Sequence, residues 1–328
     1  MDIPYAHRYI RHKEFANGAL TRVERTTSVS RTQRAPANNR AAIELVDNFS
    51  LEMTGKDVPG LIEAKDVIPA GTKINVTFLG NEDLQMRVDA AKAVRELGFV
   101  PVPHISSRRL KSQAELEEFL ARLQDVDATE HVFVVGGDPH TPEGPYENSA
   151  EVIRSGILTD YGVREVSIAG YPEGHPDIAE DVLWDALETK SASLREQGID
   201  ATILTQFGFD TEPVLAWITA VRARGIQSPI RVGVPGPAGI KRLLGFARRF
   251  GVASSAGIAA KYGFSLTNLL GTAGPDRFIG ALAGELASAS PSEAPGEVKL
   301  HFYTFGGLLA TSQWVHEFKQ TQTKALEP

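Results

Sequence analysis

The chain has 328 residues, of which 42% are hydrophobic and 23% are charged, and its formal net charge is −7. This amount of apolar material excludes a largely disordered protein. The absence of cysteine excludes disulfides, thiolate metal ligands and a catalytic thiol. No apolar run approaches the roughly 18 residues of a membrane span, and the N-terminus lacks the apolar core of a secretion signal. We therefore expect a cytoplasmic protein without membrane contact.

The first 40 residues are basic, with eight Lys or Arg residues and three acidic ones, so the rest of the chain is acidic. An acidic body argues against a nucleic-acid-binding protein. We expect residues 1–45 to form a partly ordered basic extension and residues 46–328 to form one catalytic domain. Contact of this extension with an anionic cofactor or a partner subunit remains an alternative.

After residue 45, short β-branched apolar runs alternate with longer amphipathic segments, a pattern typical of parallel α/β proteins. The predicted strands are residues 48–53, 73–78, 99–105, 131–135, 165–170, 201–207, 229–234 and 299–304.

Two of the intervening segments carry clear helix signals. Apolar residues recur every three or four positions in residues 82–97, and Gly98 follows where a C-terminal capping glycine belongs. Ser112 followed by Glu115 predicts a capping box at the start of a helix over residues 112–123. The interval between the last two strands, about residues 235–298, is long enough for two or three helices.

Eight strands alternating with helices predict a single-domain (β/α)₈ TIM barrel with extra helices between strands 7 and 8. A doubly wound open sheet is the alternative, because the number of strands does not prove closure. In such barrels the active site lies at the C-terminal ends of the strands. The polar residues that follow each apolar run are therefore the candidates for the active site.

Those residues make a polar ring of two carboxylates with histidine, glutamine, threonine and tyrosine side chains. Each feature alone is commonplace, since a histidine at a strand end is more often structural, but their joint occurrence indicates a site. The ring includes Glu52, Thr77, His104, Asp138, Tyr171, His175, Gln206 and Tyr303.

Several familiar chemistries lack their motifs. The sequence has no phosphate-binding Walker loop, no strand-following Gly-x-Gly-x-x-Gly and no Gly-x-Ser-x-Gly elbow. It has no His-Glu-x-x-His pair, so no metal site is predicted. Glu52 and Asp138 could form a glycosidase pair, although the chain has only three tryptophans for stacking a sugar.

Four segments resemble the methylenetetrahydrofolate reductase family. They are residues 132–139, 168–176, 204–210 and 300–304, and residues 229–237 match in place and pattern. The most specific signal is Tyr-Pro-Glu-x-His-Pro followed about 30 residues later by Thr-Gln-Phe, within a similarity that runs from about residue 48 to 316.

This resemblance implies a flavoprotein barrel that is a homo-oligomer and acts on a folate. In the family, a hydride passes from NADH or NADPH to FAD and then to the methylene carbon of the folate. The protein would thereby interconvert 5,10-methylenetetrahydrofolate and 5-methyltetrahydrofolate.

The resemblance also assigns residue roles. Glu52 matches the proton donor that helps to form the 5-iminium cation, and Asp138 matches the aspartate that stabilises this cation near the flavin. Gln206 and Tyr303 match substrate-binding positions. The positions that match FAD-binding ones are Thr77, His104, Gly137, Asp138, Ala169, Tyr171 and His175, with Asp185 and Lys190 near the FAD phosphates.

Three departures lie around the cofactor and folate rim. Residues 53–56 do not match the family's Phe-Phe-Pro-Pro, and Gly136 replaces an arginine, so a cation is missing. Residues 304–307 are Thr-Phe-Gly-Gly, where the family usually has Thr-Leu-Asn-Arg. These differences leave open a flavin-free folate reductase of the same fold, or a non-catalytic folate-binding subunit of a methyltransferase system.

Overall fold

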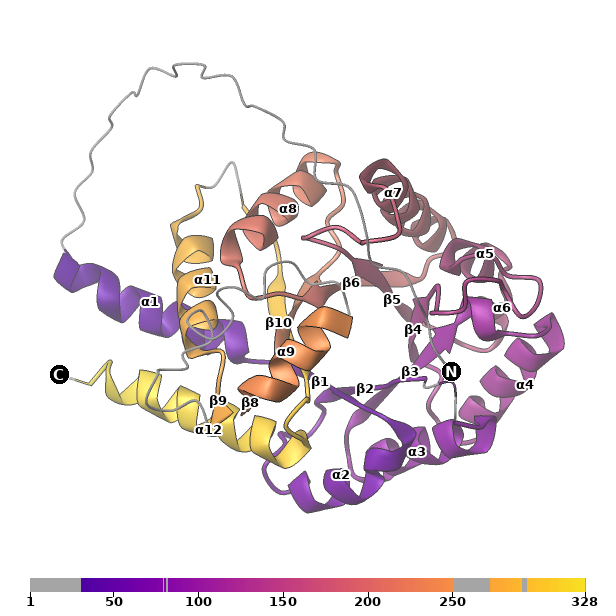
Figure 1. Cartoon of the computed structure of the whole chain (residues 1–328), viewed down its shortest axis with the longest axis horizontal. Helices are drawn as coiled ribbons and strands as arrows, with labels where there is room; N and C mark the ends of the chain where they lie inside the picture. The colour runs from indigo at the N-terminus through magenta and orange to yellow at the C-terminus, as the bar shows by residue number, and fades with distance from the viewer. Residues whose placement is uncertain (1–30, 79, 81, 250–271, 291–293, 328) are drawn as a thin grey trace.

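The computed structural model describes residues 31–78, 80, 82–249, 272–290 and 294–327. Eight parallel strands close into a barrel in the order β1-β10-β7-β6-β5-β4-β3-β2 (Figure 1). They are β1 (Ser50–Met53), β2 (Lys73–Val76), β3 (Val100–Ser106), β4 (His131–Val135), β5 (Glu165–Gly170), β6 (Asp200–Phe207), β7 (Ile230–Pro235) and β10 (Val298–Tyr303). The predicted TIM barrel is confirmed, and closure rules out the open doubly wound sheet.

Helices surround the strands in chain order (Figure 1). They are α2 (Val58–Ala64), α3 (Leu84–Glu96), α4 (Gln113–Gln124), α5 (Ser149–Arg154), α6 (Ile157–Asp160), α7 (Glu180–Glu196), α8 (Thr211–Ala223), α9 (Ile240–Arg249), α11 (Asp276–Ser288) and α12 (Leu308–Lys324). Short 3₁₀ turns, η1 (Gly55–Asp57) and η2 (Ser107–Arg109), follow β1 and β3. None of the helices in the described ranges is long and apolar enough to cross a membrane.

The long interval between β7 and β10 contains α9 and α11, as its length predicted. Two short strands, β8 (Ala238–Gly239) and β9 (Thr272–Ala273), pair there in antiparallel fashion outside the barrel. Residues 250–271 lie outside the described part of the chain.

Helix α1 (Arg31–Val46) precedes the barrel and packs against α11 and α12. Its residues Ala42, Leu45 and Val46 are buried in the main core. The predicted domain boundary at residue 45 thus falls inside a helix that rests on the barrel. Residues 1–30 are not described, so the division into an extension and a catalytic domain stays a prediction.

The local helix signals are largely confirmed. Gly98 has a φ of +83° after α3, and Phe99 N–H donates to the Val94 carbonyl at 3.1 Å, which closes the helix end. Ser112 Oγ accepts from Glu115 N–H at 3.1 Å. The predicted capping box is only half formed, because the Glu115 carboxylate accepts from Lys111 N–H instead of returning to Ser112.

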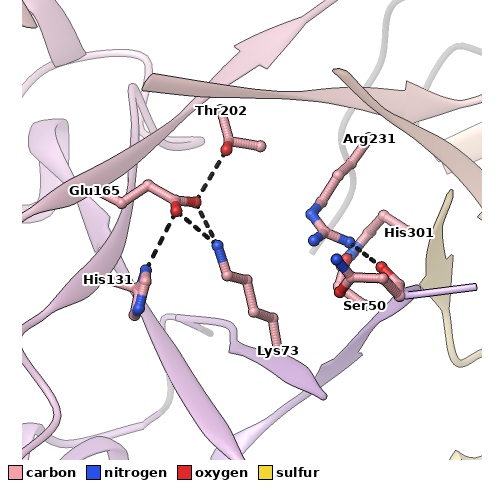
Figure 2. A network of polar contacts seen from close by, with 8 residues as sticks. Ser50, Lys73, His131, Glu165, Thr202, Arg231 and His301 are labelled. Atoms are coloured by element: carbon pink, nitrogen blue, oxygen red, sulfur yellow. Dashed lines mark hydrogen bonds and ion pairs between the residues drawn. The ribbon is translucent and has the colours of Figure 1, made fainter. Parts of the chain in front are cut away.

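A charged cluster fills the N-terminal end of the barrel (Figure 2). Lys73 Nζ, at the start of β2, lies 2.7 Å from both carboxylate oxygens of Glu165, at the start of β5. Thr202 Oγ1 donates to the same carboxylate at 2.9 Å, and His131 Nδ1 lies 3.4 Å from it. Because β3 and β4 separate β2 from β5, this ion pair spans the barrel interior and ties non-adjacent strands together.

The pKa of Glu165 reflects these contacts. Burial alone would raise it, but hydrogen bonds from His131, Lys73 and Thr202 and the charge of Lys73 outweigh burial and lower the pKa to about 2. A lowered carboxyl pKa stabilises the fold above the unfolded-state value of about 4.5, and this contribution disappears as the pH falls toward about 2.

We expect the free energy of unfolding to fall by roughly 3 kcal/mol through this cluster between pH 4.5 and pH 2. In Glu165→Gln most of that pH dependence should disappear, with lower stability at neutral pH. Urea denaturation at several pH values measures both effects. Glu188→Gln is the matched control, because Glu188 is half exposed and pairs with Arg224 at the surface. An unchanged pH profile in Glu165→Gln would show that the cluster does not set acid stability.

Candidate active site

A cavity of about 690 Å³ opens at the C-terminal ends of the barrel strands, and we call it the mouth. Most of its walls come from β1, β3, β4, β5, β6 and β10 and from the loops that follow β2 and β5. Eight of the residues singled out in the sequence line it: Glu52, Thr77, His104, Ala169, Tyr171, His175, Gln206 and Tyr303. Parallel strands thus bring together side chains that are far apart in the sequence.

Glu52 lies beside a buried hydrogen-bonded pair. The register of β1 with β10 places Ser50 opposite His301, and Ser50 Oγ lies 2.9 Å from His301 Nδ1 (Figure 2). His301 Nε2 lies 3.6 Å from Glu52 Oε2. Ser50 and His301 are fully buried, whereas the Glu52 side chain keeps 21% of its surface exposed to the mouth.

His301 and Ser50 were not among the predicted site residues. Side chains alternate along a strand, so Ser50 shares a face with Glu52 and His301 shares a face with Tyr303. This two-residue period was the signal that could have found them, since it extends the search from the strand end into the barrel.

The two histidines near Glu52 are neutral at neutral pH. Burial lowers the pKa of His104 to about 4, although the charge of Glu52 opposes this. Burial also lowers the pKa of His301, against the hydrogen bond and charge of Glu52. Neither imidazole therefore presents a full positive charge to the Glu52 carboxyl. His104 Nε2 is held 3.3 Å from Asn75 Oδ1.

The two tyrosines of the mouth stay protonated. Burial, with smaller contributions from Glu52 and Tyr171, raises the pKa of Tyr303 well above its ordinary value. The Tyr303 hydroxyl donates to the Thr205 carbonyl at 3.1 Å. Burial raises the pKa of Tyr171 as well, and its ring meets His175 edge-on at 5.5 Å between centroids. Both phenols are thus neutral, fixed parts of the wall.

Asp138 and Gly137 lie at the rim rather than among the residues that line the mouth. The Asp138 side chain is 77% exposed and forms two hydrogen bonds of 2.8 Å with the Arg109 guanidinium. The cation that appeared to be missing at Gly136 is therefore supplied from η2. Gly137 has a φ of +99°, and a Cβ there would lie 2.2 Å from Ser106 Oγ, so the turn requires glycine.

Asp185 and Lys190 do not come together. Asp185 is exposed on α7 beside the carboxylates of Glu180 and Glu188. Lys190 is buried on the same helix, and burial lowers its pKa to about 8. Because Asp185 is exposed and Lys190 is buried, the two side chains do not form a phosphate-binding pair.

The mouth suits the ring system of a flavin. Thr77 Oγ1 is buried there and has no hydrogen-bond partner among the described residues. A bound ligand would supply the missing hydrogen bond. The backbone of Ala169 and Gly170 also lines the cavity, so a planar ligand can approach closely.

The surface beside the mouth has a different character. A second cavity of about 480 Å³, the outer hollow, adjoins the mouth through the loop between β5 and α7. Its lining includes Glu173, Glu180 and Trp184, and no lysine or arginine of the described residues takes part. The lining of this hollow therefore offers no cation that could hold the diphosphate half of FAD, whereas the lining of the mouth suits the flavin ring.

The sequence profile of methylenetetrahydrofolate reductases matches residues 48–255. The chain belongs to the methylenetetrahydrofolate reductase family. The predicted family is therefore confirmed, and the match covers β1 to α9, which carry most of the mouth.

Curated relatives in this family are longer proteins. The chain is 33% identical over 132 residues to methylenetetrahydrofolate reductase 2 of Saccharomyces cerevisiae, covering 37% of this chain and 20% of that protein. It is 36% identical over 132 residues to methylenetetrahydrofolate reductase (NADH) 1 of Zea mays, covering 36% and 22%. The matched region thus spans about a fifth of either relative's length.

Among solved structures, dihydropteroate synthase of Thermus thermophilus is similar at a TM-score of 0.43 and 15% identity. That likeness covers 84% of this chain and 94% of the synthase and adds nothing to the family assignment.

We expect Ser50→Ala to lower the free energy of unfolding by about 1–3 kcal/mol, because a buried imidazole nitrogen loses its partner. Thermal or urea denaturation measures this change. Ser288→Ala is the matched control, since Ser288 is exposed and bonds only within α11. Equal effects of the two substitutions would mean that the Ser50–His301 contact does not stabilise the fold.

Proposed function

We propose that the protein interconverts 5,10-methylenetetrahydrofolate and 5-methyltetrahydrofolate, with NADH or NADPH as the electron partner. The observation that carries this proposal is the Glu52 carboxyl in the mouth, partly exposed beside the buried Ser50–His301 pair. Family membership supplies the reaction class, and the strand-end residues supply a site of the right composition.

Glu52 acts as the general acid. Opening the five-membered ring of the methylene folate requires a proton on the leaving nitrogen, and it leaves a 5-iminium cation that accepts a hydride. Glu52 donates this proton, and it recovers a proton in the oxidative direction. The neutral imidazoles of His104 and His301 add no positive charge beside the carboxyl, so they do not repel the cation.

Two side chains orient the pterin. Gln206 offers both a donor and an acceptor from the wall of β6, which suits the paired donors and acceptors of a pterin ring. The Tyr303 ring lies on the same side of the mouth, where its hydroxyl donates to the carbonyl of Thr205 on β6. Asp138 contributes negative charge that stabilises the cation, and this role requires its carboxylate to turn from Arg109 toward the mouth.

FAD is the proposed electron carrier, which supplies two-electron transfer between the nicotinamide and the folate. Thr77, His104, Ala169, Tyr171 and His175 would hold its ring, with the backbone of Gly137 at the rim. Asp185 and Lys190 are no longer part of this proposal as phosphate ligands, because one is exposed among carboxylates and the other is buried.

A flavin-free reductase is the second candidate, and the acidic outer hollow favours it. The nicotinamide would then occupy the slot in the mouth and transfer its hydride directly. The carboxylates of Glu173 and Glu180 also disfavour an additional phosphate, and the maize relative is named for NADH. We therefore propose NADH as the electron donor. A cytoplasmic location and assembly as a homo-oligomer stay predictions from the sequence.

We expect Glu52→Gln to abolish folate turnover, by at least about a hundredfold in kcat, because the amide cannot deliver a proton. Oxidation of NADH by an artificial acceptor should continue in this variant if flavin is bound. Steady-state assays with each acceptor measure the two rates. Full folate activity in Glu52→Gln would remove this residue from the proposed role.

The visible absorption spectrum distinguishes the two candidates. If the protein carries FAD, oxidised-flavin bands should appear in the purified protein and pass into the supernatant after heat denaturation. If it is flavin-free, the protein should be colourless, take up no added FAD and still reduce methylene folate with NADH. A colourless protein without folate turnover would contradict both candidates.

A further inference from the structure

A helix on the side of the mouth carries cations that the sequence analysis did not consider. Helix α9 is fixed there by a small apolar cluster, in which Leu243 and Ala238 are buried together with Phe207. Tyr303 and Phe305, both part of the mouth, pack against this cluster. The first turn of α9 therefore borders the cavity, whereas its residues Lys241 and Arg242 are exposed.

Arg242 reaches the edge of the mouth itself. Its guanidinium donates to the carbonyl oxygen of Phe305 at 2.6 Å, and the Phe305 ring lines the cavity. The ring lies at 6.0 Å from the Tyr303 ring in a stacked arrangement, so the carbonyl stands just outside an aromatic wall. One guanidinium nitrogen is used in this bond, and the exposed side chain has further donors to offer.

The turn that presents this carbonyl is tightly constrained. A Cβ on Gly306 would lie 1.9 Å from the Pro237 carbonyl oxygen, so the turn after β10 and the turn before β8 are in backbone contact. Only glycine permits this approach. This backbone contact fixes the position of Phe305 relative to the start of α9. The fold itself therefore places Arg242 beside the Phe305 carbonyl.

Charge around the mouth makes Arg242 distinctive. The cavity is lined by three acidic residues, Glu52, Asp57 and Asp177, and by no lysine or arginine of the described part of the chain. Arg109, at the rim, is already bound to Asp138. Gly307 stands where the family usually has arginine, so the turn after β10 lacks a cation of its own.

We propose that Arg242 binds the carboxylate-bearing tail of the folate substrate as the tail leaves the mouth. This inference rests on the proposed function. A folate has a pterin at one end and a glutamate dianion at the other, joined by an aromatic ring. With the pterin beside Glu52, the ring crosses the Tyr303–Phe305 wall and the dianion meets the guanidinium, which binds carboxylates in a bidentate manner.

The decisive experiment compares substrates with and without the tail. For Arg242→Ala we expect KM for 5,10-methylenetetrahydrofolate to rise about tenfold, with kcat within about twofold and KM for NADH unchanged. With 5,10-methylenetetrahydropteroate, which lacks the glutamate, the variant and the wild-type protein should have the same KM. An equal rise in KM for both substrates would overturn the proposal.

Two further variants separate binding from structure. Arg242→Gln keeps a donor for the Phe305 carbonyl and loses the charge, so its Tm should stay near wild type while KM rises as in Arg242→Ala. Lys241→Ala removes the neighbouring exposed cation and leaves Arg242 to bond the Phe305 carbonyl, so it should change KM less than twofold. If Lys241→Ala raised KM as much as Arg242→Ala, the effect would come from the overall positive charge of this helix turn and not from Arg242. That result would overturn the assignment.

Failure of the proposed function has a different signature. If the wild-type protein does not turn over folate, calorimetric titration with 5-methyltetrahydrofolate still tests the tail contact. Binding that weakens about tenfold in Arg242→Gln supports Arg242 even without catalysis. Absence of any folate binding by the wild-type protein would reject both the function and this inference.

Discussion

The parallel pairing of β1 with β10 closes the barrel, and the site depends on it. The pairing brings Ser50 and His301, 251 positions apart in the sequence, to a separation of 2.9 Å. It also sets Glu52 at 3.6 Å from the same imidazole. Strand β10 comes after α9 and α11 in the sequence. Nearly the whole chain must therefore fold before Glu52, Ser50 and His301 come together. Contacts of such long range are entropically costly and form late, so the site is a product of the finished fold.

The two ends of the barrel divide stability and chemistry between them. At the N-terminal end, Lys73, His131 and Thr202 satisfy the Glu165 carboxylate (Figure 2). At the C-terminal end, Thr77 Oγ1 is buried without a hydrogen-bond partner among the described residues, and the only contact of His301 Nε2 there is the longer one with Glu52. Unsatisfied polar groups cost stability, and proteins tolerate them mainly where a ligand completes them. The Glu165 carboxylate at one end has its donors, whereas the Thr77 hydroxyl at the other end has no partner among the described residues.

The sequence predicted the barrel because β-branched runs are short and regular, and each observed strand lies within two residues of its expected bounds. It also predicted most of the mouth, since parallel strands all end at one rim and a polar residue closing a run must point there. The sequence did not reveal that Asp138, Asp185 and Lys190 lie outside the lining of the mouth, and the reason is physical. These residues lie on a loop and a helix, where direction depends on partners such as Arg109 that no local pattern reveals. Arg242 was missed because its contact with Phe305 joins a helix to a turn 63 positions away in the sequence.

Polarity along the mouth matches the polarity of the proposed substrate. The deepest groups are the uncharged imidazoles of His104 and His301, with the Glu52 carboxyl in front of them. Next comes the aromatic wall of Tyr303 and Phe305, and then the Arg242 guanidinium at the edge. This arrangement favours a molecule that develops positive charge at its inner end and carries carboxylates at its outer end. The same molecule bound in the reverse orientation would be disfavoured. The acidic outer hollow strengthens the bias, because its carboxylates disfavour the anionic end in the cavity that adjoins the mouth. Charge thus selects which end of the substrate reaches Glu52.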